Sequence, residues 1–389
     1  MALINIIRYG ILIASATGLA ACAQTPQPEP APPPIPTVGE VDLDTAKSDP
    51  QDYLLLDIGV EVFEIEISEQ EALEFGEWIF TEIRESEAHY LPYILRNTLL
   101  ASNQWGAARV LPTHDPSMDL TIQGTVLSSD GQRLTMWVEA LDSTGRVWLQ
   151  KDYSDESLTD DYPVSTRYTP GSPFDASEFI EPFQDIYDQI NNDLVEVRQT
   201  LSIEDLIDIK RVSQLVYASD LSPESFAHNL DKDENGRMSI LTLPAEDDPQ
   251  MRRVEEMRLR HHLFIDTVDQ YYESLYEEMQ APYVVWRKYS YDQIEEETNS
   301  ADNAYDFSNY GRSRGFLTLT QRYDRYRWSK IFEMEYRDLS VGFNNEIAPA
   351  ILQLNEQVHG LNGTMEEQYI QWRRILRQLF ALEAEIPNG

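Results

Sequence analysis

The chain of 389 residues is strongly acidic, with 68 Asp and Glu against 30 Lys and Arg and a formal net charge of −38 at pH 7. Phosphate binding needs a cationic surface, so this balance argues against nucleic acid as a partner. The single cysteine excludes an intrachain disulfide framework and zinc sites built from CxxC pairs. Hydrophobic residues make up 42% of the chain, enough for a packed core, and the length favours two or three domains.

The first residues have the pattern of a secretory signal, with Arg8 as their only charge before an apolar stretch and a run of small residues. The sequence Leu19-Ala20-Ala21-Cys22 that ends this segment is similar to the lipobox of bacterial lipoproteins. The resemblance implies that residues 1–21 are a signal peptide, cleaved before Cys22, and that acyl chains such as palmitate are attached to Cys22. The alternatives are an ordinary signal peptide with a leftover thiol, or a short hydrophobic start to a cytosolic chain. An Asp after the cysteine would resemble an inner-membrane retention signal; Ala23 stands there, which favours the periplasmic face of the outer membrane.

Residues 22–49 are expected to form a lipid-anchored linker. Seven prolines fall between positions 26 and 36, and such a run favours extended polyproline II. At about 3.1 Å per residue, 13 residues of this kind reach roughly 40 Å. Because an acidic body is repelled by an anionic membrane, we expect the lipid to supply the anchoring.

Residues 50–155 are predicted to form a small α+β interaction domain. Residues 53–67 alternate like a strand, and residues 69–102 follow a helical pattern in which Pro92 is expected to open a new helix. A short strand should end at Pro112. Further strands are expected at 119–127, 134–141 and 146–153, with turns at 128–131 and 142–145.

The order of a helix, the segment WGAARVLP and the hairpin DLTIQGTVLSSDG resembles the envelope lipoprotein domains of the CsgG, LpoB and TolB-N-terminal kind. This likeness covers about a quarter of the chain and includes no catalytic motif. It implies a periplasmic interaction or assembly domain. The long amphipathic hairpins that a CsgG pore subunit contributes are not seen in the sequence, so a secretion channel is not implied.

Residues 156–177 are polar and rich in turn formers, which predicts a linker or surface loop. Helical periodicity then dominates residues 178–389, so the fold class expected is α+β, a small sheet-and-helix domain followed by a mostly helical domain. Helices are predicted over 178–194, 203–219, from Asp248-Pro249 through Met279, over 319–339 and 342–358, and from a capping box at 364–367 to the C-terminal region.

Residues 231–236 match the start of an EF-hand loop, with Asp231, Asp233 and Asn235 as candidate oxygen ligands for calcium. The twelfth position, where such a loop needs a bidentate Glu, is Thr242. A plain turn before a strand explains the same residues, so no metal is predicted here.

Gly311-Arg312-Ser313-Arg314-Gly315 fits the G-x-S-x-G pattern of a nucleophile elbow. With an acid at Asp324 or Asp338 and with His359, Ser313 would complete the chain order of a hydrolase triad. The elbow needs a hydrophobic strand before the serine, but residues 302–310 are polar. A glycine-flanked loop between helices is therefore favoured.

Two further sets of residues suit either a functional or a structural role. His261, His262 and Asp266 could suggest metal ligation, but His261 lies on the apolar stripe of its predicted helix, which favours a core histidine. Residues 322–328 interleave arginines with aromatic residues, which suits either a glycan-binding surface or a helix with paired arginines.

No P-loop, GxGxxG or HExxH motif occurs, and no cofactor is predicted. The sequence favours an outer-membrane lipoprotein that acts as a binding or scaffold component of an envelope assembly, transport or cell-wall system. Its expected partner is an envelope protein or a cell-wall polymer. The alternative is an envelope hydrolase with an unrecognised active site.

Overall fold

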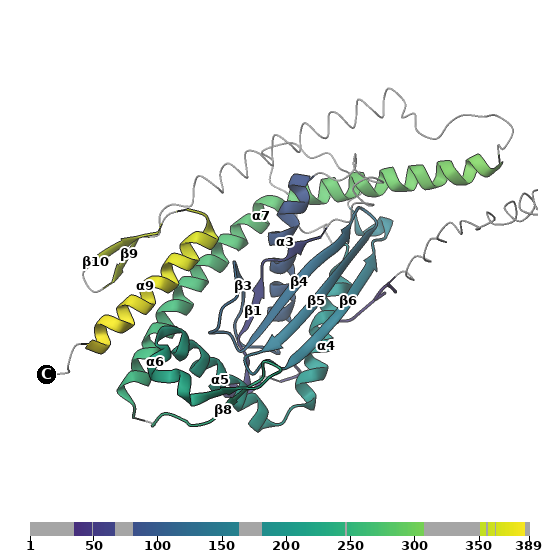
Figure 1. The fold of residues 1–389 in the computed structure, drawn as a ribbon. Helices are drawn as coiled ribbons and strands as arrows, with labels where there is room; N and C mark the ends of the chain where they lie inside the picture. The colour runs from purple at the N-terminus through teal and green to yellow at the C-terminus, as the bar shows by residue number, and fades with distance from the viewer. Residues whose placement is uncertain are drawn as a thin grey trace, which may run out of the picture. The chain divides into compact units, whose positions relative to one another are not determined.

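A mixed six-stranded sheet lies at the centre of the fold (Figure 1). Its strand order is β3-β1-β4-β5-β6, with β2 paired to β4 beyond the end of β1. β1 runs parallel to β3 and β4, whereas β4, β5 and β6 form an antiparallel meander. The strands are β1 (Ile58–Glu61), β2 (Glu64–Ile65), β3 (Ala108–Leu111), β4 (Leu120–Ser129), β5 (Arg133–Asp142) and β6 (Val147–Glu156).

The computed structural model describes residues 35–48, 50–66, 81–162, 181–245, 247–306, 351–354, 357–361 and 363–385. Its helices are α3 (Thr81–Ala101), α4 (Gln184–Thr200), α5 (Ile203–Leu221), α6 (Pro223–Phe226), α7 (Pro249–Asp306) and α9 (Met365–Glu385). Three short 3-10 helices are η1 (Asp52–Leu54), η2 (Thr159–Asp161) and η4 (Ala227–Asn229). Two hairpins pair β7 (Leu230–Lys232) with β8 (Met238–Ile240) and β9 (Ile351–Leu354) with β10 (Gln357–Gly360).

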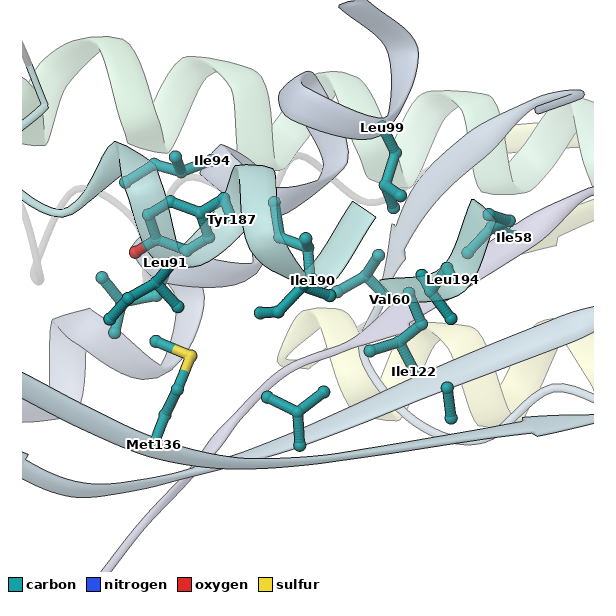
Figure 2. Packing of buried hydrophobic residues seen from close by; sticks show 14 of the residues in the cluster. Ile58, Val60, Leu91, Ile94, Leu99, Ile122, Met136, Tyr187, Ile190 and Leu194 are labelled. Carbon is teal, nitrogen blue, oxygen red and sulfur yellow. The ribbon is translucent and has the colours of Figure 1, made fainter. Parts of the chain in front are cut away.

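The main core lies between one face of the sheet and helices α3 and α4. Ile122, Met136 and Val138 alternate with polar residues along β4 and β5, and all three are completely buried. Opposite them, α3 and α4 contribute leucine, isoleucine and tyrosine side chains (Figure 2). The residues labelled in Figure 2 are Ile58, Val60, Leu91, Ile94, Leu99, Ile122, Met136, Tyr187, Ile190 and Leu194. Burying each such side chain is worth about 1.5–3 kcal/mol relative to exposure.

This core crosses the predicted boundary between the two domains. Tyr187, Ile190 and Leu194 of α4 belong to the predicted helical domain, yet they pack in one cluster with the strands. By its contacts, the chain from Ile35 to Gly389 forms a single unit. The α+β class is therefore present, but the two predicted parts, residues 50–155 and 178–389, share one core.

The expectation that Pro92 opens a new helix is wrong, because α3 continues through it from Thr81 to Ala101. Proline has no N–H, so it cannot bond the carbonyl of Ala88 four residues earlier. That carbonyl instead accepts a hydrogen bond of 2.9 Å from the backbone N–H of Phe63, beside β2. A tertiary contact thus satisfies the group that Pro92 leaves unpaired.

The helix expected over 342–358 is also wrong where the structure describes it, since β9 and β10 form an antiparallel hairpin there. Other helical predictions are confirmed. α5 begins at Ile203, and Thr364 and Glu367 form the predicted capping box at the start of α9. α7 starts at Pro249 as expected and continues for 58 residues, far beyond Met279.

Candidate functional site

Asp115, in the loop between β3 and β4, is the centre of a buried polar cluster. One carboxylate oxygen lies 2.6 Å from Nε2 of His261 on α7 and accepts a hydrogen bond from the Tyr369 hydroxyl on α9. The other accepts from the Ser117 backbone N–H at 2.7 Å and from the Ser117 hydroxyl. We call Asp115, Ser117, His261 and Tyr369 the Asp115 cluster. It joins the sheet to two helices far apart in the sequence.

The electrostatics of the cluster favour an ionised aspartate. Burial alone would raise the pKa of Asp115, but His261, Arg373 and Ser117 outweigh it and hold that pKa well below its usual range. Burial, reinforced by the charge of Asp115, raises the pKa of Tyr369 well above 10.0. Tyr369 therefore keeps its proton, and its hydroxyl donates a hydrogen bond to the carboxylate of Asp115. His261 stacks on the Tyr217 ring of α5, with ring centroids 5.7 Å apart.

A neighbouring serine and histidine raise the possibility of nucleophilic catalysis. Nε2 of His262 lies 3.3 Å from the Ser117 hydroxyl, and burial followed by Arg258 and Arg109 lowers the pKa of His262 to about 3. A neutral imidazole could accept the serine proton. However, Ser117 is completely buried and its hydroxyl donates to Asp115. A substrate cannot reach this serine, so the arrangement serves to brace the fold.

The predicted histidine site has the same structural role. His261 is a fully buried core residue, as expected from its place on the apolar stripe. Asp266, the third candidate, forms an ion pair of 2.6 Å with Arg109 on β3. Within the described ranges, no group of three or more His, Cys, Asp or Glu could hold a metal ion.

Asp231, Asp233 and Asn235 lie on the exposed hairpin formed by β7 and β8. One oxygen of Asp233 accepts backbone hydrogen bonds of 2.8 Å from both Asn235 and Arg237. Gly236 follows with φ +83°, a conformation that glycine adopts without strain. These bonds use the carboxylate to close a turn.

The other predicted site residues are not brought together here. His359 lies on β10, where it pairs with Leu352 of β9. Cys22, Ser313, Asp324, Asp338 and the arginine-aromatic segment 322–328 lie outside the described residues.

A second buried polar group surrounds Arg287 of α7. Its guanidinium donates to Glu87 of α3 at 2.8 Å, to Ser129 of β4 at 2.6 Å and to the Tyr283 hydroxyl at 2.7 Å and 2.9 Å. The same group contacts the carbonyl of Asp130 and lies 4.8 Å above the Phe183 ring. We call Glu87, Ser129, Tyr283 and Arg287 the Arg287 cluster. Burial opposes the charge on Arg287, but Tyr283 and Glu87 raise its pKa above the usual value for an arginine, so it stays a cation.

Four residues of these clusters were not predicted as site residues: Asp115, Tyr369, Glu87 and Arg287. Tyr369 has the helical spacing of its apolar neighbours Met365, Trp372 and Leu376, which indicates burial, and a buried tyrosine hydroxyl needs a partner. Arg287 stands among apolar and aromatic neighbours in the segment Tyr283-Val284-Val285-Trp286-Arg287, which is a signal for a buried charge. The partner of each lies across the fold, and no local pattern identifies it.

Comparison with known proteins adds no functional assignment. No protein-family model matches the chain, and no curated protein matches it. None of the helices in the described part of the chain combines the length and the apolar composition needed to cross a bilayer.

Proposed function

We propose that this protein is a lipoprotein anchored in the outer membrane through Cys22, facing the periplasm, and that it works as a binding or scaffold component of an envelope assembly, transport or cell-wall system. The observation that carries the proposal is the lipobox at residues 19–22 followed at once by a proline-rich segment. Its partner would be an envelope protein or a cell-wall polymer.

Hydrogen bonds between residues 38–46 and the folded part of the chain support the proposed anchor, because they attach the segment that follows the proline-rich tether. The backbone N–H of Val38 donates to Ser154 of β6, and that of Val41 donates to Asp185 of α4, both at 2.8 Å. Asp44 and Ala46 donate in the same way to Asn192 and to the Ser102 carbonyl. Residues 38–46 are thus fixed along the edge of the sheet and α4. The remaining tether, residues 23–34, would span about 37 Å if extended as polyproline II.

The two polar clusters favour a scaffold over the alternative hydrolase. Asp115 and Arg287 hold elements together from positions that are 1% and 0% exposed, so neither is available to a substrate. The hydrolase proposal rests on Ser313, outside the described residues, and nothing in the described residues adds to it.

We also propose that the chain has two functional parts, a sheet-and-helix part over 50–155 and a helical part over 178–389. All six strands of the main sheet fall in or next to the first range, and α4, α5, α7 and α9 fall in the second. The likeness to CsgG-type, LpoB-type and TolB-N-terminal domains assigns the interaction role to the first part. The shared core means that the two parts work as one body.

The test of the anchor is mass spectrometry of the mature N-terminus together with membrane fractionation. The wild-type chain should begin at an acylated Cys22 and sediment with outer membranes, whereas Cys22→Ser should stay unprocessed or become soluble. Ala23→Asp is the matched control, because it should keep the lipid and move the protein to the inner membrane. An unmodified terminus, or one that starts elsewhere, would refute both the anchor and the localisation.

The test of the scaffold role is crosslinking in intact cells. Photo-crosslinkers placed on the exposed surface of the sheet-and-helix part should yield discrete adducts with an envelope protein or with cell-wall fragments. These adducts should weaken in Cys22→Ser, because the anchor sets the local concentration of the protein at the membrane. Hydrolysis of an envelope polymer by the purified protein, lost in Ser313→Ala, would instead establish the hydrolase.

A further inference from the structure

Glu181 is a buried carboxylate with no hydrogen-bond partner. It lies two residues before the buried Phe183, and its carbonyl accepts from Gln184 at 3.1 Å at the beginning of α4. Both of its side-chain oxygens are inaccessible to solvent, and neither has a partner in the structure. An ionised carboxylate in such a place is costly unless it is paired.

Among the described residues, the ionisable groups near Glu181 come from three helices and from the segment after β6. They are Glu87 and Tyr90 of α3, Tyr187 of α4, Tyr276, Tyr283 and Arg287 of α7, and Tyr162 after β6. The hydroxyls of Tyr90 and Tyr187 and one oxygen of Glu87 also lack a partner. Glu181 therefore lies among polar groups, but none of them bonds it.

The one cation in this group is already engaged. Arg287 directs its N–H groups to Glu87, Ser129, Tyr283 and the Asp130 carbonyl. Arg287 is already paired with the Glu87 carboxylate, so an ionised Glu181 would leave an unbalanced negative charge in the core. A proton on Glu181 removes that imbalance.

We propose that Glu181 is a proton-operated latch: it is held neutral in the folded protein, and its ionisation releases residues 181–183 and the start of α4 from α3 and α7. Phe183 would leave with it, because its ring is completely buried against the Arg287 guanidinium. The proton comes from solvent and binds one carboxylate oxygen, and no other group needs to change its charge.

The direction of titration agrees with this geometry. Burial is the largest cause and raises the pKa of Glu181 to about 7, with Arg287 lowering it and Glu87 raising it further. The Tyr90 hydroxyl also lowers the pKa of Glu181, although the hydroxyl and the carboxylate do not meet the geometry of a hydrogen bond. Because the pKa is higher in the folded than in the unfolded chain, the stabilisation is complete below about pH 4.5 and is lost as the pH rises through about 7.

The experiment measures unfolding of the full chain in urea from pH 5.5 to 8.5, above the pI of about 4.3, for wild type and Glu181→Gln. Glutamine has the shape of the protonated acid and cannot ionise. The ratio of the wild-type to the variant folding constant should fall about 30-fold over this range, as expected for a pKa moved from about 4.5 to about 7. Glu196→Gln, an exposed change on the same helix, should show a constant ratio.

Hydrogen exchange locates the effect. Protection factors, corrected for intrinsic exchange at each pH, should fall for residues 181–190 between pH 6 and 8.5 in the wild type and stay constant in Glu181→Gln. A flat stability ratio, or equal loss of protection in both proteins, would overturn the latch. If Glu181→Gln does not fold, the infrared carbonyl band of a protonated carboxylic acid in the wild type decides: its presence at pH 6 and loss by pH 8.5 supports the latch, and its absence at pH 6 overturns it.

Discussion

Changing Asp115 to Asn tests whether the Asp115 cluster couples the sheet to α7 and α9. Asparagine keeps the size and shape of the side chain and removes its charge. It cannot accept at both ends from His261, Tyr369 and Ser117, because one of its two polar atoms is a donor. The substitution therefore leaves the donors at one end of the side chain unpaired, either those of His261 and Tyr369 or those of Ser117.

The expected cost follows from the contacts. A hydrogen bond to a charged group contributes about 1.5–3 kcal/mol, and removing one partner of a buried ion pair costs about 3–5 kcal/mol. Asp115 is 1% exposed and makes four such contacts, which are not additive. We expect Asp115→Asn to lower the free energy of unfolding by about 3–5 kcal/mol. Tyr369→Phe, which removes one hydroxyl, should cost about 1–2 kcal/mol.

Urea denaturation followed by circular dichroism and tryptophan fluorescence measures these losses. The matched control is Asp208→Asn, because that carboxylate is 58% exposed and its contact with Arg211 is 3.5 Å long. An exposed pair of this kind contributes at most about 1 kcal/mol, and often nothing measurable. The stability difference between Asp115→Asn and the wild type should also depend on pH. Because the pKa of Asp115 is lower in the folded than in the unfolded chain, ionised Asp115 stabilises the fold above about pH 4. The variant should therefore be less stable than the wild type at neutral pH and differ little from it in strong acid. If Asp115→Asn and Asp208→Asn shift the urea midpoint equally, the cluster does not brace the fold.

Four other expectations can be checked separately. Gly131→Ala should cost about 1–3 kcal/mol in urea denaturation, because its Cβ would stand 2.7 Å from the Arg287 carbonyl in the backbone of α7; a neutral result would mean that α7 is displaced easily. Thr364→Ala should lower stability by about 1 kcal/mol through loss of the α9 capping box, and Thr364→Ser should restore it. Calorimetry should detect no calcium binding in the millimolar range, and an isotherm that disappears in Asp231→Ala would contradict the assignment of a turn. A fragment of residues 178–389 should give a weak, non-cooperative thermal transition, since it exposes the α4 residues that pack on the sheet; a sharp transition would show that the helical part folds alone.

Local patterns were enough to predict most elements but few of their connections. The turns that bound β4, β5 and β6 and the capping box of α9 depend on neighbours in the sequence, and both are found in the structure. Pro92 was misjudged because the partner that satisfies Ala88 is Phe63, some 25 residues away. Residues 342–358 were predicted to be helical, although a short apolar segment cannot be assigned to a helix or a hairpin by its spacing alone.

The polar clusters depend entirely on long-range contacts. Asp115 stood in the sequence as one acid among 68, and nothing near it indicates that His261 and Tyr369 surround it. The sequence predicts that His261 is buried, because its position on the helical stripe is a local property. It cannot predict which acid meets it, because that choice is made when α7 packs against the loop before β4.

The use of arginines inside the fold bears on the proposed lipid anchor. Arg96 pairs with Asp269, Arg109 with Asp266 and Arg287 with Glu87, and each pair joins α7 to α3 or to the sheet. The chain has only 30 Lys and Arg, and these three arginines form ion pairs inside the fold. The surface therefore carries less positive charge than the composition suggests. Attraction to anionic headgroups falls with each basic group lost from the surface, at about 1 kcal/mol apiece. The packing of α7 therefore weakens any electrostatic docking to an anionic membrane, which is consistent with the proposal that a lipid on Cys22 supplies the anchor.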